Sequence, residues 1–190
     1  MNLIKSILLK VLVKKTAKAN MLSTPKTIKL PDKKLIGYSI TTTIKNNKQK
    51  EDIPPFYHDI YDNNKLGILK SDDEFNMYCI FDMHLNQEDF DYYITVENKT
   101  GIDDDEYAQI QIPEGKYIQV ELIKRNNKTV SMIIFYIRNI WLKSNGYKER
   151  KAPLIILYDQ RFHTNYQKYG CRGNDYLGMP VATLQIPVED

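Results

Sequence analysis

Apolar and polar side chains alternate along residues 25–44, the period-two pattern of a β-strand. A polar stretch follows at 46–52. From Ile53 to Tyr61, apolar residues recur at i, i+3, i+4, i+7 and i+8, which predicts an amphipathic helix with Pro54 and Pro55 in its first turn. Asn64 and Gly67 close this helix, and residues 77–85 and 92–97 are predicted to be two strands joined by a polar turn.

The second half of the chain repeats this order. Residues 107–123 predict a strand stretch that is kinked by a turn at 113–115. Apolar residues at helical spacing then run from Val130 to Trp141, with Thr129 as N-cap and Gly146 just past the end. Residues 154–158 and 181–188 predict the last two strands. Each half therefore has the order β-α-β-β.

Short runs of sequence also recur in the same order in the two halves. LPDKKLI at 30–36 returns as IPEGKYI at 112–118, and FYHDIY at 56–61 as FYIRNIW at 135–141. CIFD at 79–82 returns as ILYD at 156–159, and ITVE at 94–97 as IPVE at 186–189. We interpret the chain as a tandem pseudo-two-fold repeat, with half-repeats 25–97 and 107–189 and a linker at 98–106. The predicted fold class is α+β, with antiparallel sheets and with helices flanking a central cleft at the boundary of the halves.

Composition and charge narrow the class of protein. The chain has 190 residues, 42% of them hydrophobic, and a net charge of +3, as expected of a globular protein. Five lysines and no acidic residue lie in the first nineteen positions, so the remainder carries no broad basic footprint for nucleic acid. Two distant cysteines, Cys79 and Cys171, indicate reduced thiols in a cytoplasmic protein.

Residues 1–24 form a separate basic, amphipathic segment. A signal peptide is one interpretation, because Ala17, Lys18 and Ala19 have the small-x-small pattern. Lys10 interrupts the apolar run, however, which favours an amphipathic helix that contacts either a membrane surface or the domain itself.

Catalytic and metal-binding motifs are not found in the sequence. His58, His84 and His163 are scattered without ligand spacing, so we expect no metal and no cofactor. Cys171 with His163 is a conceivable nucleophile pair, but the glycines around Cys171 are more typical of a loop. The acidic run at 103–105 indicates a solvated loop rather than a cation site.

Aromatic residues are the stronger indication of function. Alternation along 154–162 places Ile156, Tyr158 and Gln160 on one face and Ile155, Leu157 and Asp159 on the other. Tyr38, Tyr93, Tyr117 and Trp141 fall at related places in the two halves. Core packing is the alternative explanation for any one of these aromatic side chains. Together they predict an apolar pocket with hydroxyl groups at the boundary of the halves. The candidate ligand-binding residues are Tyr38, Phe56, Tyr61, Tyr93, Tyr117, Trp141, Ile156 and Tyr158.

Over residues 25–189 these segments resemble the effector-binding domain of AraC-type and MerR-type regulators, which also occurs in gyrase-inhibitor-like and integron-associated effector-binding proteins. The resemblance is carried by LPDKKLIG at 30–37, IPPFY at 53–57, YYITV at 92–96, IPEGKY at 112–117, IWLKSNGY at 140–147, LYDQRF at 157–162 and IPV at 186–188.

The resemblance implies a tandem β-α-β-β fold whose central cleft binds hydrophobic, often cationic, small molecules. In many members a glutamate two residues before the equivalent of Tyr158 neutralises the ligand, whereas this chain has Ile156 there. Glu121 or Asp82 is a candidate substitute, and Thr95, at a position where a small residue is usual, is expected to narrow the cleft.

The leading hypothesis is therefore a stand-alone binding protein for a hydrophobic small molecule, acting as a sensor or sequestering module. The nineteen leading residues leave no room for a helix-turn-helix unit, so we expect no direct contact with nucleic acid. Two alternatives from the same family are a hydrolase that acts on electrophilic small molecules and a module that binds a protein partner, as gyrase inhibitors do.

Overall fold

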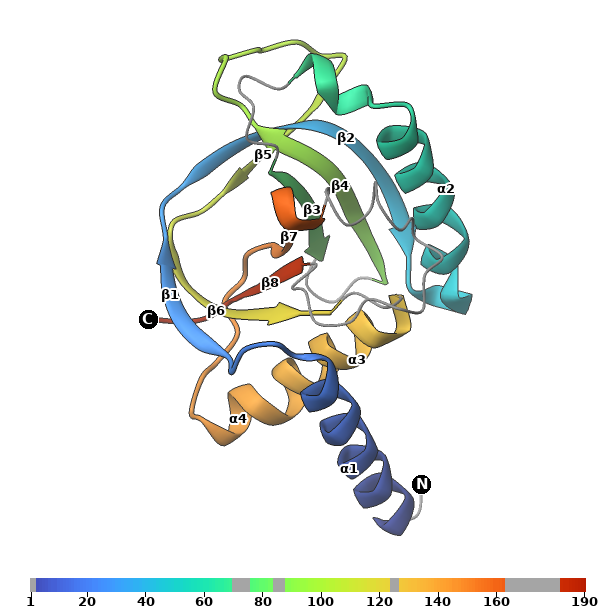
Figure 1. The fold of residues 1–190 in the computed structure, drawn as a ribbon, viewed down its shortest axis with the longest axis vertical. Helices are drawn as coiled ribbons and strands as arrows, with labels where there is room; N and C mark the ends of the chain where they lie inside the picture. The colour runs from blue at the N-terminus through green and yellow to red at the C-terminus, as the bar shows by residue number, and fades with distance from the viewer. Residues whose placement is uncertain (1–2, 70–75, 84–87, 124–126, 163–181) are drawn as a thin grey trace.

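The computed structural model describes residues 3–69, 76–83, 88–123, 127–162 and 182–190, and its fold is drawn in Figure 1. Its strands are β1 (Lys26–Leu30), β2 (Lys33–Thr43), β3 (Met77–Met83), β4 (Asp89–Glu97), β5 (Ala108–Ile112), β6 (Gly115–Leu122), β7 (Leu154–Tyr158) and β8 (Ala182–Pro187). Its helices are α1 (Leu3–Asn20), η1 (Lys45–Asn47), α2 (Gln49–Asp62), η2 (Lys65–Ile68), α3 (Asn127–Tyr136), η3 (Ile137–Trp141) and α4 (Leu142–Ser144). The predicted α+β class is confirmed.

The eight strands form one antiparallel sheet in the order β1-β6-β8-β7-β3-β4-β2-β5. The sheet is strongly curled, as two short connections require. Only Pro31 and Asp32 separate β1, at one edge, from β2, beside the other edge, and only Pro113 and Glu114 separate β5 from β6 in the same way. Two residues span only about 7 Å, so the two edges must lie close together and the sheet becomes a half-barrel.

This curl corrects one sequence prediction. Residues 25–44 are not a single strand but β1 and β2, which pair with partners at opposite ends of the sheet order. The kink predicted at 113–115 separates β5 from β6 in the same manner, and Gly115 adopts a φ of 140° there. The residues at either break do not by themselves reveal that the strands change partners, because that change depends on pairing with strands distant in the sequence.

The two faces of the sheet cover different cores. The larger core lies between the sheet and the helices, and it includes Ile60 of α2 and Ile133 of α3. A smaller core lies on the opposite face, inside the curl, where side chains from strands near both edges meet. Its buried members are Leu35, Tyr78, Ile80, Ile112, Tyr117 and Ile155.

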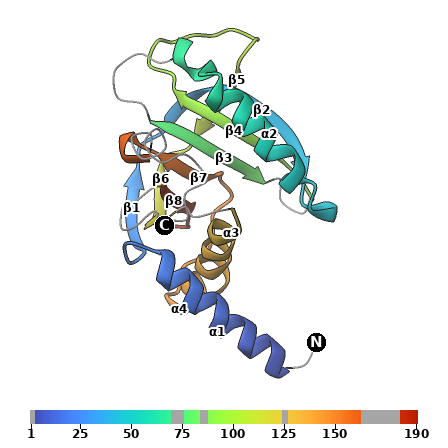
Figure 2. The ribbon, with the colours of Figure 1, turned by 45° about the vertical axis from the view of Figure 1, so that its right-hand side comes forward.

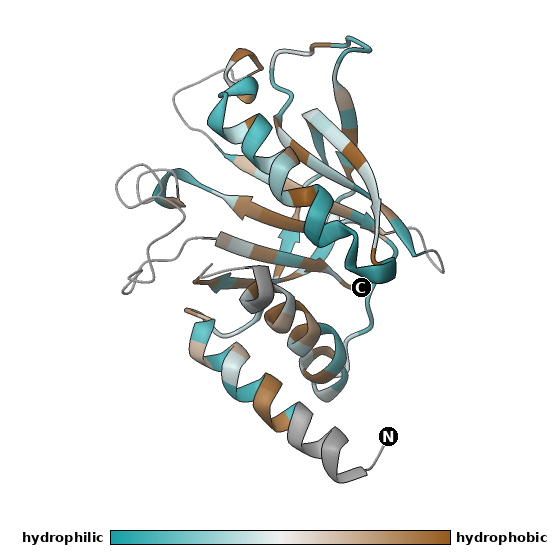
Figure 3. Ribbon diagram, turned by 90° about the vertical axis from the view of Figure 1, so that its right-hand side faces the viewer, coloured by the Kyte–Doolittle hydropathy of each residue, from teal (hydrophilic) through white to brown (hydrophobic). Residues whose placement is uncertain are grey.

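Helix α2 packs against β2 and β4 with the predicted apolar stripe, and its outer face is hydrophilic (Figure 3). It begins at Gln49 rather than Ile53, so the two prolines lie beyond its first turn. The carboxylate of Asp52 accepts hydrogen bonds from Thr42 Oγ1 at 2.7 Å and Lys48 Nζ at 3.0 Å. These bonds lower the pKa of Asp52 and stabilise a first turn whose polar residues are typical of a loop.

The second amphipathic helix is a composite of α3, η3 and α4. It begins at Asn127, so Thr129 lies inside the helix and is not its N-cap. Residues Ile137–Trp141 adopt π-helical geometry, which the apolar spacing does not reveal. Gly146 follows the end with a φ of 74°, and Tyr147 N donates to Leu142 O at 3.0 Å, as predicted for a glycine past a helix C-terminus.

Helix α1 packs against α3, with Val13 and Ala17 buried, while its first turns extend away from the domain (Figures 1 and 2). A backbone bridge between Met21 and Leu122 then joins the chain to β6. Of the two contacts considered for this segment, the structure shows the one with the domain. No helix in the described ranges is long and apolar enough to cross a membrane.

Candidate functional site

The antiparallel pair β3 and β7 forms the middle of the sheet, with Cys79 directly opposite Ile156. Both side chains are buried and belong to the larger core, on the face that carries the helices. Their neighbours Ile80 and Ile155 belong to the smaller core on the other face. The predicted alternation along residues 154–158 is therefore confirmed, although β7 ends at Tyr158 and Gln160 lies beyond it, exposed.

Eight aromatic rings belong to the same core as this central pair, on the helix-bearing face, and we call them the aromatic cluster. They come from α2, β3, β4, β7 and the turn after β7, so that residues distant in the sequence meet here. The members are Phe56, Tyr57, Tyr61, Phe81, Phe90, Tyr92, Tyr158 and Phe162.

Ring-to-ring contacts connect α2 with the end of β7. Tyr57 stacks on Tyr61 with centroids 5.5 Å apart, Tyr61 meets Phe162 edge-on at 6.2 Å, and Phe162 lies 4.4 Å from Tyr158. A second series runs from Phe56 to Tyr92 at 6.2 Å and on to Phe81 at 4.9 Å. Aromatic faces and edges are groups that attract hydrophobic and cationic partners.

The polar atoms in this cluster are tyrosine hydroxyls, and the thiol of Cys79 belongs to the same core. Burial raises the pKa of Tyr92 well above its usual value, and the nearby Cys79, Tyr158 and Tyr57 raise it further. Tyr92 therefore remains protonated at physiological pH, as a neutral hydrogen-bonding group. The cluster thus combines apolar surface with uncharged polar groups.

Neither carboxylate proposed as a substitute for the missing glutamate faces the aromatic cluster. Glu121 and Asp82 each alternate with residues of the larger core and so point to the other face of the sheet. Glu121 Oε1 lies 3.2 Å from Arg161 Nη1 in an ion pair. Among the described residues, none of the buried polar side chains is a carboxylate. The described part of the site is therefore without a buried negative charge.

Thr95 also points away from the cluster, contrary to the expectation that it narrows the cleft. It lies opposite Tyr78 in the register of β3 and β4, on the side of the smaller core, and is fully buried. Its hydroxyl donates to Tyr78 O at 3.2 Å. Its role in this structure is to satisfy a backbone carbonyl inside the sheet.

The structure brings four of the eight predicted residues together. Phe56, Tyr61 and Tyr158 belong to the aromatic cluster, and Ile156 lies buried beneath it in the same core. Tyr38 is on the same face but packs edge-on against Tyr107, with centroids 5.9 Å apart.

Tyr93 and Tyr117 lie on the opposite face, in the smaller core. The hydroxyl of Tyr117 donates to Pro113 O at 2.9 Å, and the guanidinium of Arg150 lies 5.3 Å from its ring centroid. Burial raises the pKa values of both tyrosines. These two side chains help to fill the inside of the curl rather than to line the helix-bearing face.

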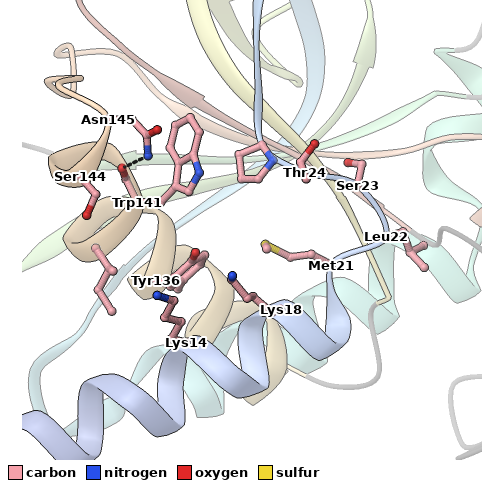
Figure 4. Close-up of a pocket in the computed structure, with 12 residues that line it drawn as sticks. Lys14, Lys18, Met21, Leu22, Ser23, Thr24, Tyr136, Trp141, Ser144 and Asn145 are labelled. Atoms are coloured by element: carbon pink, nitrogen blue, oxygen red, sulfur yellow. Dashed lines mark hydrogen bonds between the residues drawn. The ribbon is translucent and has the colours of Figure 1, made fainter.

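Trp141, the eighth predicted residue, belongs to η3 and is half-buried. Its ring stacks on Tyr147 with centroids 5.6 Å apart and an interplanar angle of 10°. It faces a cavity beside α1 rather than the aromatic cluster (Figure 4).

The other residues considered for catalysis or metal binding lie on the surface or outside the described residues. His58 is exposed and its Nδ1 lies 2.9 Å from Asp62 Oδ2, so the surface interpretation of this histidine is confirmed. His84, His163 and Cys171 lie outside the described residues. Within the described ranges, no group of three His, Cys, Asp or Glu side chains is placed to hold a metal ion.

Sequence reasoning missed Tyr57, Phe81, Phe90, Tyr92 and Phe162 as members of this site. Period-two alternation contains part of the missing signal, because Phe90, Tyr92 and Ile94 share a face and Tyr93 does not. The alternation does not say which face meets α2. That assignment depends on contacts between strands and helices far apart in the chain.

The sequence was compared with models of protein families and with known proteins. Residues 27–182 match the family model Cass2, described as integron-associated effector binding protein. A comparison with curated proteins finds no significant match.

Several solved structures have the same fold. SAV2435 bound to tetraphenylphosphonium is 17% identical, with a TM-score of 0.64 over 88% of this chain and 94% of that one. A putative bacterial transcription regulation protein from Staphylococcus aureus MU50 is 18% identical, with a TM-score of 0.61 over 88% and 99%. The integron cassette protein VCH_CASS2 of Vibrio cholerae is 12% identical, with a TM-score of 0.57 over 87% and 95%. At these identities the likeness shows the fold alone.

Proposed function

Because this chain belongs to the integron-associated effector-binding protein family, we propose that it binds a hydrophobic, aromatic small molecule against the aromatic cluster. The observation that carries this proposal is the meeting of ring-bearing side chains from α2, β3, β4 and the end of β7 in the core that also contains the central Cys79–Ile156 pair. Protein sites for small molecules are mostly apolar and aromatic, with a few polar groups that orient the ligand, and this cluster has that composition.

We further propose that the two halves are a duplicated β-α-β-β unit with the aromatic cluster at their boundary. The sheet order supports this. Suppose that β1, β2, β3 and β4 exchange places with β5, β6, β7 and β8, respectively. The strand order of the sheet is then the observed order in reverse, and the β3–β7 pair stays at its centre. The repeated runs at 30–36 and 112–118 both begin at the short connections that cross between the edges of the sheet.

The charge of the ligand follows from the polar groups available. The related SAV2435 structure holds tetraphenylphosphonium, a hydrophobic cation. In this chain Ile156 supplies no counter-charge, and Asp82 and Glu121 lie on the other face of the sheet. Ring faces attract a cation by about 0.5–2 kcal/mol. A buried carboxylate selects for a cation more strongly, because leaving it without a charged partner costs about 3–5 kcal/mol. We therefore propose a site that accepts aromatic cations but also binds neutral ligands of similar shape.

Binding is favoured over the hydrolase alternative for a related reason. A hydrolase of this fold would need an acid–base group against its ligand. The described aromatic cluster supplies tyrosine hydroxyls and the Cys79 thiol, and the raised pKa of Tyr92 makes this hydroxyl a poor base. These groups suit hydrogen bonding to a bound molecule better than they suit proton transfer.

The experiment is a calorimetric titration of the full chain with tetraphenylphosphonium and with the neutral triphenylphosphine oxide. We expect saturable binding of both compounds at one site and a rise in Tm, because each would bury rings against the cluster. A preference for the cation above about a hundredfold, or about 2.7 kcal/mol, would contradict the absence of a counter-charge. If neither compound nor a wider set of aromatic ligands raises the Tm, the binding function itself is contradicted.

A further inference from the structure

A cavity of about 580 Å³ lies between α1, the connection from α1 to β1, and the η3 segment (Figure 4). This volume is within the range of about 300–1,000 Å³ typical of small-molecule sites. None of its lining residues belongs to the aromatic cluster. They are Lys14, Lys18, Met21, Leu22, Ser23, Thr24, Pro25, Tyr136, Ile140, Trp141, Ser144 and Asn145.

One wall of this cavity is α1, which is fixed to the domain at its C-terminal end. Ala17 is fully buried against the domain. Asn20 O accepts a hydrogen bond from Ile123 N at 2.9 Å, and Leu22 N donates to Glu121 O at 2.8 Å. These backbone bonds tie the end of α1 to the end of β6. The cavity is therefore bounded by anchored elements.

The opposite wall is the π-helical segment η3. A π-helical turn contains an extra residue and so shifts the side chains that follow it, and such turns are frequent at functional sites. Here it places Ile140 and Trp141 at the cavity. Stacking on Tyr147 holds the indole in place, and Tyr147 Oη lies 2.9 Å from Thr27 Oγ1. This wall offers a flat, apolar surface in a defined orientation.

The charged groups of the cavity are of one sign. Lys14 and Lys18 are one helical turn apart on α1 and lie on either side of Tyr136 in Figure 4. No lining residue is acidic. Within the described part of the chain, neither ammonium group has a carboxylate oxygen within 4.0 Å. Like charges at this spacing destabilise a helix slightly, and an anion between them would relieve the repulsion.

Tyr136 adds an uncharged donor between the two lysines. Its side chain is 4% exposed and lines the cavity, and no described residue forms a hydrogen bond with its hydroxyl. Burial also raises the pKa of Tyr136, so the hydroxyl keeps its proton. Two ammonium groups and one hydroxyl are thus available on one side of the cavity, facing the apolar Trp141 wall.

We propose that this cavity is a second ligand site, distinct from the aromatic cluster, that binds an anionic amphiphile. Its apolar body would pack against Trp141, Ile140 and Met21. Its carboxylate, sulfonate or phosphate group would lie between Lys14 and Lys18 and accept a hydrogen bond from Tyr136. The charge preference is the opposite of that of the lipophilic cation bound by SAV2435.

The chain contains its own probe for this site, because Trp141 is its single tryptophan. The experiment titrates the full chain with decanoate, and with neutral decanamide as a comparison, while the emission of Trp141 is recorded. We expect a saturable shift with decanoate and binding of decanamide that is at least about tenfold weaker, which corresponds to about 1.4 kcal/mol.

Two double variants test whether decanoate binds in the cavity or is attracted by the overall positive charge of α1. Lys14→Gln with Lys18→Gln removes two charges from the cavity, whereas Lys10→Gln with Lys15→Gln removes two charges from the same helix outside it. We expect the first pair to weaken decanoate binding at least about tenfold and the second to change it less than about twofold. Equal weakening in both pairs would overturn the proposal.

Two further measurements distinguish the remaining outcomes. Tetraphenylphosphonium binding should be the same in all these variants and should not displace decanoate, so that failure of one site is seen independently of the other.

Val11 and Leu12 are each 59% exposed on α1, and a membrane surface is the competing partner. If vesicles containing anionic phospholipid shift the emission of Trp141 but decanoate does not, α1 binds membranes and the cavity proposal fails.

Discussion

Cys79 and Ile156 lie directly opposite one another on β3 and β7, buried at the centre of the sheet beneath the aromatic cluster. They are also corresponding residues in the repeated runs CIFD and ILYD. The resemblance to effector-binding domains implies a glutamate at the position of Ile156 in many relatives. The centre of this sheet therefore presents a thiol and an aliphatic side chain, at the point where the resemblance implies a negative charge.

The first prediction restores that charge. Ile156→Glu should bind tetraphenylphosphonium at least about tenfold more tightly than Ile156→Gln, because the two side chains have the same size and hydrogen-bonding reach but differ in charge. The measurement is calorimetry on both variants. Burial raises the pKa of a carboxyl group, so the advantage should grow as pH rises through that pKa and be absent below it. Equal affinities at every pH would contradict a central position for residue 156 in the site.

The second prediction compares two half-buried tyrosines, both chosen from the sequence. Tyr61 contacts Tyr57 and Phe162 in the aromatic cluster, whereas Tyr38 packs against Tyr107. Tyr61→Ala should weaken triphenylphosphine oxide binding roughly tenfold, because an aromatic contact is worth about 0.5–1.5 kcal/mol beyond its buried area. Tyr38→Ala should leave it within about twofold. The Tm of each variant serves as the control for folding, and the reverse ranking would move the site toward the edge of the sheet.

The third prediction concerns alkaline stability. Burial, with a smaller effect of Glu97, raises the pKa of Tyr78 to about 12 in the folded state, from 10.0 for the unperturbed group. The unfolded chain therefore loses this proton first, and the contribution to stability is full below pH 10 and lost between pH 10 and about 12. The expected loss is about 1.4 kcal/mol per pH unit over this range.

Urea unfolding at several pH values measures this effect. Tyr78→Phe removes the titrating hydroxyl, so its free energy of unfolding should fall less steeply above pH 10 than that of the unmodified chain. Tyr92, whose pKa is also raised, remains in both proteins and cancels in the comparison. Parallel curves would show that Tyr78 does not titrate abnormally.

The fourth prediction tests the close approach of β2 to β4. A Cβ atom added to Gly37 would lie 2.2 Å from Ile94 O and 2.8 Å from Thr95 Cα, both parts of the backbone. Gly37→Ala should therefore lower the free energy of unfolding by about 1–3 kcal/mol, a typical cost of overpacking. Ser39→Ala, at an exposed position of the same strand, should change it by less than about 0.5 kcal/mol. Chemical denaturation of the two variants provides the comparison.

Much of the local structure could be predicted from the chain. The apolar stripe of α2 contains Tyr57 and Ile60, which are buried, and alternation along β7 correctly separates Ile156 from Ile155. These patterns arise from the geometry of single elements. A helix repeats every 3.6 residues and a strand every 2.0, so the spacing of apolar residues shows which side chains share a face. The start of α2 at Gln49 was missed, because its polar first turn is stabilised by Thr42, a residue of another element.

The site depended on more than local pattern. Tyr92 and Tyr93 are adjacent and identical in type, yet one belongs to the aromatic cluster and the other to the smaller core. Trp141 was predicted at the boundary of the halves, but the π-helical turn and the packing of α1 place it beside a separate cavity. No periodicity within one segment encodes which neighbour a face will meet.

By itself, then, the sequence determined the order of the elements, the repeated runs and the aliphatic character of position 156. The tertiary structure alone decided that Pro31 and Pro113 mark crossings between the two edges of a curled sheet. It also decided that Glu121 and Asp82 point away from the cluster and that α1 completes a second cavity. The reason is physical. Periodicity follows from backbone geometry within one element. The curl of the sheet, the core that each strand face meets and the packing of α1 follow from contacts between residues far apart in the chain.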